Sequence, residues 1–181
     1  MTLFFLAEYK DGNGSLQERR KAQTMRFERL WNAVAKRLNS LGCTHPNNKR
    51  VNAAWAFMLC WMADCYFIEK NGKSMLDRPF HDIGEGNPYN KEFWHNTLNR
   101  LNDVKTIRCK GGNVALFEAE QRAIDFACDW FADMDWYSIR DNKAFSTIPY
   151  YDLWVHFRDE GKTVVDDKMI AKAISLVGRS Q

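Results

Sequence analysis

The chain has 181 residues, of which 45% are hydrophobic and 27% are charged. This content predicts one compact globular domain over residues 1–181, or two very small ones, and it argues against a disordered chain. The formal net charge of +3 is too small to indicate a polyanionic partner by itself, so the distribution of charge along the chain matters more.

Residues 1–14 are expected to form an N-terminal strand or arm that ends in a glycine-rich turn. The apolar run Leu3–Ala7 has no Lys or Arg before it and is followed at once by charged residues, which is wrong for a secretory signal peptide. The other long apolar run, Ala53–Ala63, has about half the length needed to cross a membrane. We therefore expect a cytoplasmic protein without a membrane partner.

Positive charge is concentrated at the start of the chain, where the first 50 residues carry ten Lys and Arg against four Asp and Glu. A capping box at Ser15–Glu18 predicts the start of a long amphipathic helix, and Gly42 is expected to close it. Arg26, Arg29 and Arg37 fall to one side of its apolar stripe. This pattern indicates a basic face for an acidic partner, with an internally balanced, solvated face as the alternative.

The cysteines are odd in number and show no C-x-x-C spacing, so neither a disulfide framework nor a zinc finger is indicated. Buried free thiols are expected at Cys43, Cys60, Cys65, Cys109 and Cys128. The pair Cys43 and His45 comes nearest to a metal motif, but without a second pair downstream a loop is the better interpretation. No cofactor or metal is expected.

A second helix of roughly twenty residues, around Trp55 to Met62, is apolar on nearly all sides and should be the central helix of the core. Asp64 near its end is expected to mark its one exposed face, and a buried catalytic carboxylate is the alternative. His81 and Asp82 lie in the following loop, residues 74–87, which could supply general acid–base chemistry. Because no nucleophile with a recognised spacing accompanies them, a structural loop is favoured.

The stretch 87–117 is the most informative part of the chain. Asn87 and Pro88 are a good N-cap and first position for a helix rich in Asn, His, Arg and Lys. A basic hairpin with a Gly111-Gly112 turn follows at 104–117. This order of helix and hairpin is that of a winged helix, whose side chains contact bases and phosphates. The predicted nucleic-acid-binding residues are Arg26, Arg29, Arg37, Lys91, Asn99, Arg100, Lys105, Arg108 and Lys110.

The C-terminal third should begin with helix 118–134. Its predicted inner residues are Ala123, Phe126, Ala127, Trp130 and Met134. A carboxylate ladder is expected on its solvated outer face, with a metal site or a phosphate-like surface as alternatives: Glu118, Asp125, Asp129 and Asp133. The aromatic segments from Trp136 to Phe157 fit strand or helix, with His156 packed among them, and a last helix is expected over 164–177.

These elements predict a mainly α (α+β) fold, a single domain of five or six helices with one antiparallel β-hairpin and a winged-helix-like middle. The first functional interpretation is a small soluble regulator that binds nucleic acid. The second is an adaptor or inhibitor that binds another protein or complex through exposed aromatic side chains or through the charge asymmetry, with an acidic protein surface as the partner. The third is a hydrolase or transferase, which requires His81, Asp82 and Asp64 to converge. If the basic residues pair internally with carboxylates, the protein-binding interpretation is favoured over the nucleic-acid-binding one.

Overall fold

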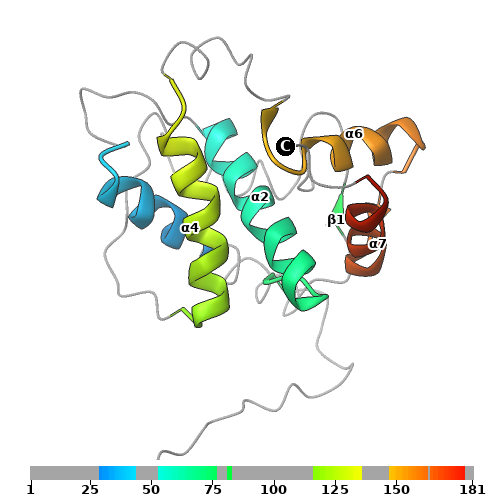
Figure 1. Ribbon diagram of the computed structural model, residues 1–181, viewed down its shortest axis with the longest axis horizontal. Coiled ribbons are helices and arrows are strands. Elements are labelled where there is room, and N and C mark those ends of the chain that lie inside the picture. Colours follow the sequence, from blue (N-terminus) through cyan, green and yellow to red (C-terminus); the bar gives the residue numbers. More distant parts are fainter. Residues whose placement is uncertain are drawn as a thin grey trace, which may run out of the picture.

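The computed structural model describes residues 29–43, 53–76, 81–82, 116–135, 147–162 and 164–177. This part of the chain is mainly helical, as predicted (Figure 1). Its helices are segment 29–40, α2 (Ala53–Asn71), α4 (Glu118–Ala132), α6 (Tyr151–Asp159) and α7 (Asp167–Val177). Two short strands, β1 (His81–Asp82) and β2 (Val164–Val165), pair in antiparallel orientation. No helix in these ranges combines the length and apolar content needed to cross a membrane.

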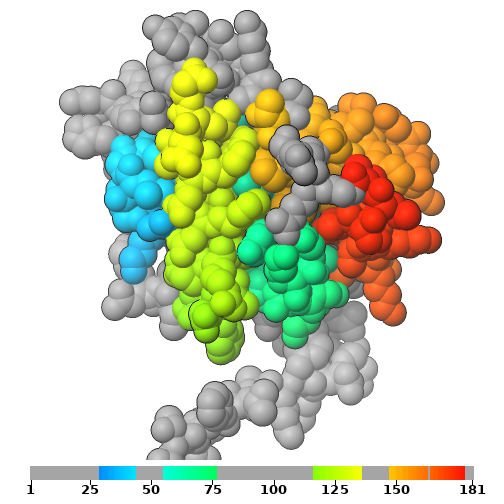
Figure 2. Space-filling view, in the orientation of Figure 1, coloured from blue at the N-terminus to red at the C-terminus, as the bar shows by residue number. Residues whose placement is uncertain are grey.

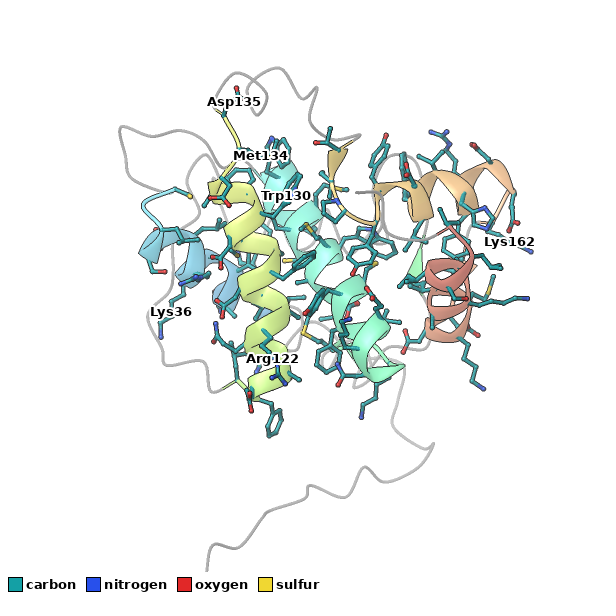
Figure 3. All side chains as sticks on the ribbon, in the orientation of Figure 1. Lys36, Arg122, Trp130, Met134, Asp135 and Lys162 are labelled. Carbon is teal, nitrogen blue, oxygen red and sulfur yellow. The ribbon has the colours of Figure 1, made fainter. Side chains whose placement is uncertain are left out.

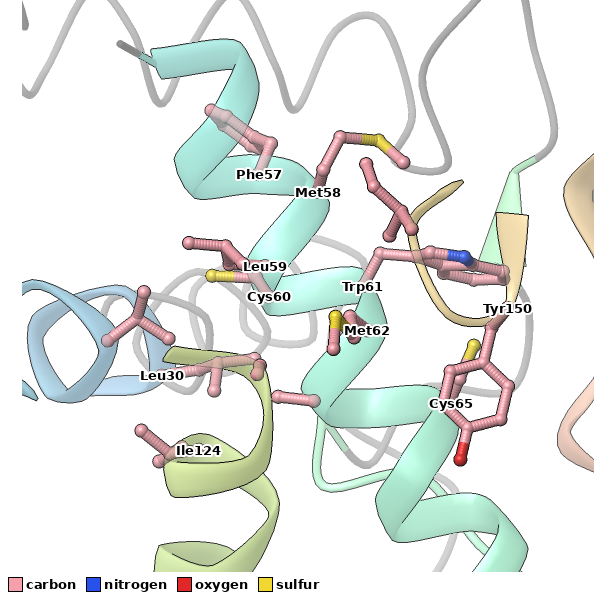
Figure 4. Close-up of a cluster of buried hydrophobic side chains, with 14 of the residues drawn as sticks. Leu30, Phe57, Met58, Leu59, Cys60, Trp61, Met62, Cys65, Ile124 and Tyr150 are labelled. Atoms are coloured by element: carbon pink, nitrogen blue, oxygen red, sulfur yellow. The ribbon is translucent and has the colours of Figure 1, made fainter. Parts of the chain in front are cut away.

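Helix α2 is the central helix of the core, which confirms the prediction. Figure 1 shows it between α4 and segment 29–40 on one side and α6 and α7 on the other. All side chains from Trp55 to Cys65 are buried, so the helix needs neighbours on every side. The Trp55 ring lies 5.2 Å from that of Phe131 on α4. Figure 4 shows Ile124 of α4 on one side of α2 and Tyr150 on the other.

Helical segment 29–40 ends as predicted at Gly42, whose φ of 73° lies in the left-handed region that glycine adopts without strain. The N–H of Cys43 donates to the carbonyl of Leu38 at 2.9 Å, and the N–H of Gly42 donates to that of Asn39 at 3.0 Å. These two bonds form a Schellman motif, which satisfies the last carbonyl groups of the helix.

The buried face of α4 is rotated from the predicted one. Its buried residues are Ala123, Ile124, Ala127, Cys128 and Phe131. Phe126 and Trp130, expected inside, lie only partly buried at the edge of the core. The Phe126 ring stacks on Tyr66 of α2 with the ring centroids 4.4 Å apart. With this rotation Asp125 and Asp129 face segment 29–40, where Arg37 contacts both.

The aromatic segment that fitted strand or helix contains α6, which follows the buried Tyr150. The phenol of Tyr150 donates a hydrogen bond to Glu69 of α2 and so ties the two elements together. His156 is half-buried, as its side chain is 34% exposed. Its ring packs against that of Phe157 with the centroids 5.4 Å apart, and its Nε2 lies 3.5 Å from the Glu160 carboxylate.

The last helix begins three residues later than predicted, because Val164 and Val165 belong to β2 and pair with Asp82 and His81. Asp166 separates strand from helix. Its Oδ1 accepts a hydrogen bond from the N–H of Met169 at 2.8 Å, which is the N-cap contact of an α-helix.

Several predictions lie outside the described residues. They concern the N-terminal arm 1–14, the helix start at Ser15, Cys109, and the winged element 87–117 except for its last two residues. Residues 116–117 are not in a strand, and Phe117 is the N-cap residue of α4. The winged-helix interpretation therefore stays a prediction. The candidate residues outside the described ranges are Arg26, Lys91, Asn99, Arg100, Lys105, Arg108 and Lys110.

Candidate functional site

The two predicted nucleic-acid-binding residues that the structure describes are both paired with carboxylates of α4. Arg29 Nη2 lies 2.6 Å from Glu120 Oε2. Arg37 places Nη2 2.6 Å from Asp129 Oδ1 and Nε 3.0 Å from Asp125 Oδ1. The basic side of segment 29–40 thus faces the acidic side of α4.

This pairing changes the interpretation of the carboxylate ladder. Asp125 and Asp129 are not on a fully solvated face, because both contact Arg37 across the helix interface. The hydrogen bond with Asp129, together with the charges of both carboxylates, raises the pKa of Arg37 against the lowering effect of burial. Glu118, by contrast, extends into solvent and pairs with Arg122 one turn along α4. Only part of the predicted ladder is therefore solvated.

Asp64 is completely buried, so the expectation that it marks an exposed face is wrong. Its carboxylate accepts hydrogen bonds from the hydroxyl of Ser74, at 2.8 Å to Oδ2, and from the N–H of Met75, at 2.8 Å. The N–H of Ser74 donates in turn to Asp167 of α7 at 2.8 Å. Asp64 therefore fixes the turn that follows α2, and the N–H of Ser74 in that turn links it to α7.

This network bears on the catalytic hypothesis. The Ser74 hydroxyl lies within hydrogen-bond distance of both oxygens of Asp64, and Oδ1 also accepts a hydrogen bond from the N–H of Met75. This is a structural arrangement for a buried carboxylate. The backbone of β1 brings His81 and Asp82 beside β2, but the side chains of these two residues lie outside the described atoms. Within the described ranges, no group of three or more His, Cys, Asp or Glu is placed to hold a metal ion.

The described cysteines are free and buried, which confirms the prediction for Cys43, Cys60, Cys65 and Cys128. Burial raises the pKa of the Cys128 thiol, and the neighbouring Arg37 opposes this shift only in part. A buried thiol that keeps its proton is a poor nucleophile. Cys128 is therefore part of the core and not a reactive group.

A different set of cations remains without a carboxylate partner in the described part of the chain. These are Lys73, Lys162, Lys168 and Lys172, all of them exposed. Lys168 and Lys172 lie on α7. Lys73 precedes Ser74, whose N–H binds Asp167 in the first turn of α7. Lys162 lies beside α7 in Figure 3. None of these four lysines was among the residues predicted from the sequence to bind a partner.

No protein-family model, curated protein or solved structure matches this chain. In the described part of the chain, Arg29 and Arg37 form ion pairs with α4 and Asp64 binds Ser74. The lysines on and beside α7 form no ion pair within the same part of the chain.

Proposed function

We propose that this protein acts by binding another protein, as a small adaptor or inhibitor. The observation that carries the proposal is the pairing of Arg29 and Arg37 with the carboxylates of α4. These arginines were expected to contact phosphates, and they instead hold two helices of the protein together.

A phosphate group would compete poorly for Arg37. Binding there would place the anion beside Asp125 and Asp129, whose side chains are 35% and 49% exposed and lie within 3.0 Å of the guanidinium. Like charges at such short range repel one another. The face shared by segment 29–40 and α4 thus favours internal pairing over a polyanion.

Catalysis receives no support from Asp64, because its oxygens are directed at Ser74 and Met75. A group that accepts protons from a substrate needs to lie within hydrogen-bond reach of that substrate or of one bridging water. A buried carboxylate that fastens a turn does not meet this requirement. A binding role is the function that the described geometry supports best.

The proposal is tested by capture from a cell lysate with the tagged full-length chain, before and after nuclease treatment. We expect a partner protein that remains bound after nuclease treatment and elutes with this chain at a fixed stoichiometry on size exclusion. Binding to duplex DNA is measured in parallel by fluorescence anisotropy at two salt concentrations. Loss of the captured material on nuclease treatment, with tight and steeply salt-dependent DNA binding, would overturn the proposal in favour of a nucleic-acid partner.

A further inference from the structure

The exposed side of α7 carries an ordered row of side chains. Lys168, Lys172 and Leu176 follow one another at intervals of four residues and are all exposed, so they lie on one side of the helix. The row is about 12 Å long at a rise of roughly 1.5 Å per residue. Lys73 and Lys162 adjoin this helix, as described above. We call these five residues the α7 lysine surface.

Positive charge on this surface is not balanced as it is elsewhere in the described part. Arg29 and Arg37 pair with α4, Arg122 pairs with Glu118, and Arg158 pairs with Asp159. None of the four lysines around α7 lies within 4.0 Å of a carboxylate oxygen of the described residues. The nearby carboxylates of Asp166 and Asp167 accept backbone N–H bonds from Met169 and Ser74 instead. Exposed lysines left without an ion pair in this way can be complemented by an acidic partner.

Exposed aliphatic side chains occur in the same region. Leu176 is 72% exposed, Val164 49% and Val177 42%, and of the large exposed hydrophobic residues in the described ranges only Phe117 lies elsewhere. Figure 2 shows α7 at one edge of the molecule. A partner that covers these side chains would remove apolar surface from water and gain affinity beyond the charge attraction.

We infer that the α7 lysine surface docks an acidic helical segment of the partner protein. The segment carries Asp or Glu at intervals of four residues, to match Lys168 and Lys172, and an apolar side chain that covers Leu176. This inference rests on the proposed function and names the surface and the chemistry of the partner.

Other polyanions fit the surface less well. The five residues of the α7 lysine surface include no aromatic side chain for base stacking and no arginine for bidentate contact with bases, and Leu176 has no counterpart on a phosphate backbone. A membrane would require a broad apolar face, yet the apolar residues Ile170, Ala173 and Ile174 of α7 are buried in the core. A second copy fits less well too, because much of the acidic side of α4 is already engaged by Arg29 and Arg37.

The inference is tested by NMR titration of the ¹⁵N-labelled full-length chain with a synthetic helical peptide that has Glu at every fourth position and one Leu at its end. We expect saturable shifts confined to residues 162–177 and to the turn around Lys73, weaker at about 300 mM than at about 50 mM salt. The variant Lys168→Glu/Lys172→Glu should weaken binding at least about tenfold. Leu176→Ser should weaken binding severalfold with the charge unchanged.

The matched control is Lys36→Glu/Arg122→Glu, which makes the same charge change on the other side of the molecule from Lys162 (Figure 3). It should bind the peptide like the parent protein. Equal loss in both double variants would overturn the inference, as would shifts of the same residues by duplex DNA or by phosphatidylserine vesicles at lower concentration than by the peptide.

The captured partner separates this inference from the proposed function. If the partner binds Lys168→Glu/Lys172→Glu as well as the parent chain, the α7 lysine surface is rejected while a protein-binding role stands. If the capture experiment instead shows only nucleic acid, the proposed function fails, whatever the peptide does. Far-UV circular dichroism of each variant confirms that the helices are retained.

Discussion

Replacing Arg37 by Gln tests whether this side chain holds two helices together or is free to bind phosphate. The change keeps most of the side-chain stem and removes the charge that faces Asp125 and Asp129. Partly exposed ion pairs contribute about 0.3–1 kcal/mol each after solvent screening. With two carboxylates on one guanidinium, we expect a loss of about 1–2 kcal/mol in the free energy of unfolding.

Urea denaturation followed by tryptophan fluorescence measures this loss. At a slope of about 2 kcal/mol per M, the midpoint should fall by roughly 0.5–1 M. The difference should shrink at high salt, because mobile ions screen the pairs. A double-mutant cycle with Asp129→Asn should give a coupling energy of about 0.5–1 kcal/mol.

Arg122→Gln is the matched control, because Arg122 pairs with Glu118 within α4 and the two side chains are 63% and 83% exposed. Its loss should stay below about 0.5 kcal/mol. A zero coupling energy between Arg37 and Asp129, with Arg37→Gln no more destabilising than the control, would refute the pairing. In that case the guanidinium of Arg37 would be available to bind a nucleic-acid phosphate.

Three further outcomes are expected. Asp64→Ala leaves the Ser74 hydroxyl and the Met75 N–H without their buried acceptor, so it should cost about 2–5 kcal/mol in urea unfolding, whereas Asp64→Asn should cost clearly less. Asp166→Ala removes the N-cap of α7 and should cost about 0.5–2 kcal/mol, with Asp166→Asn near neutral. Burial raises the pKa of Cys128, so the folded state holds this proton more tightly. The contribution of Cys128 to the free energy of unfolding is fully present below about pH 8.5, which is the pH near which the thiol of an unfolded chain begins to lose its proton. It should decline as the pH rises above that value, and Cys128→Ala should remove this part of the decline.

Elements with a strong local signal could be predicted from the sequence. The apolar run at the start of α2 has too few polar positions for a surface helix, and it indeed forms the buried centre. Gly42 adopts the left-handed conformation that its place after a helix indicated. These features depend on neighbours a few residues away, which periodicity and capping patterns report directly.

Features that depend on distant residues could not be predicted in the same way. The burial of Asp64 depends on donors in the turn at Ser74 and Met75, which an apolar pattern within α2 does not reveal. The contact of α4 with Arg37 joins residues that lie 92 positions apart in the sequence, so the periodicity within α4 could not report it. The strand at Val164 pairs with β1, which lies in the middle of the chain at His81 and Asp82, although a pair of β-branched residues before Asp166 was a usable signal.

The net charge of the sequence does not distinguish basic residues that pair with carboxylates inside the fold from basic residues that stay exposed and unpaired. Arg29 and Lys168 each contribute one positive charge to the sequence, yet Arg29 is neutralised by Glu120 at 2.6 Å and Lys168 lies exposed on α7. A partner responds to the potential outside the surface, which depends on the cations that the fold leaves unpaired. The excess of positive charge in the first 50 residues, taken as a sign of a basic face, therefore points in part to an internal contact, and the α7 lysine surface is where an acidic partner should bind.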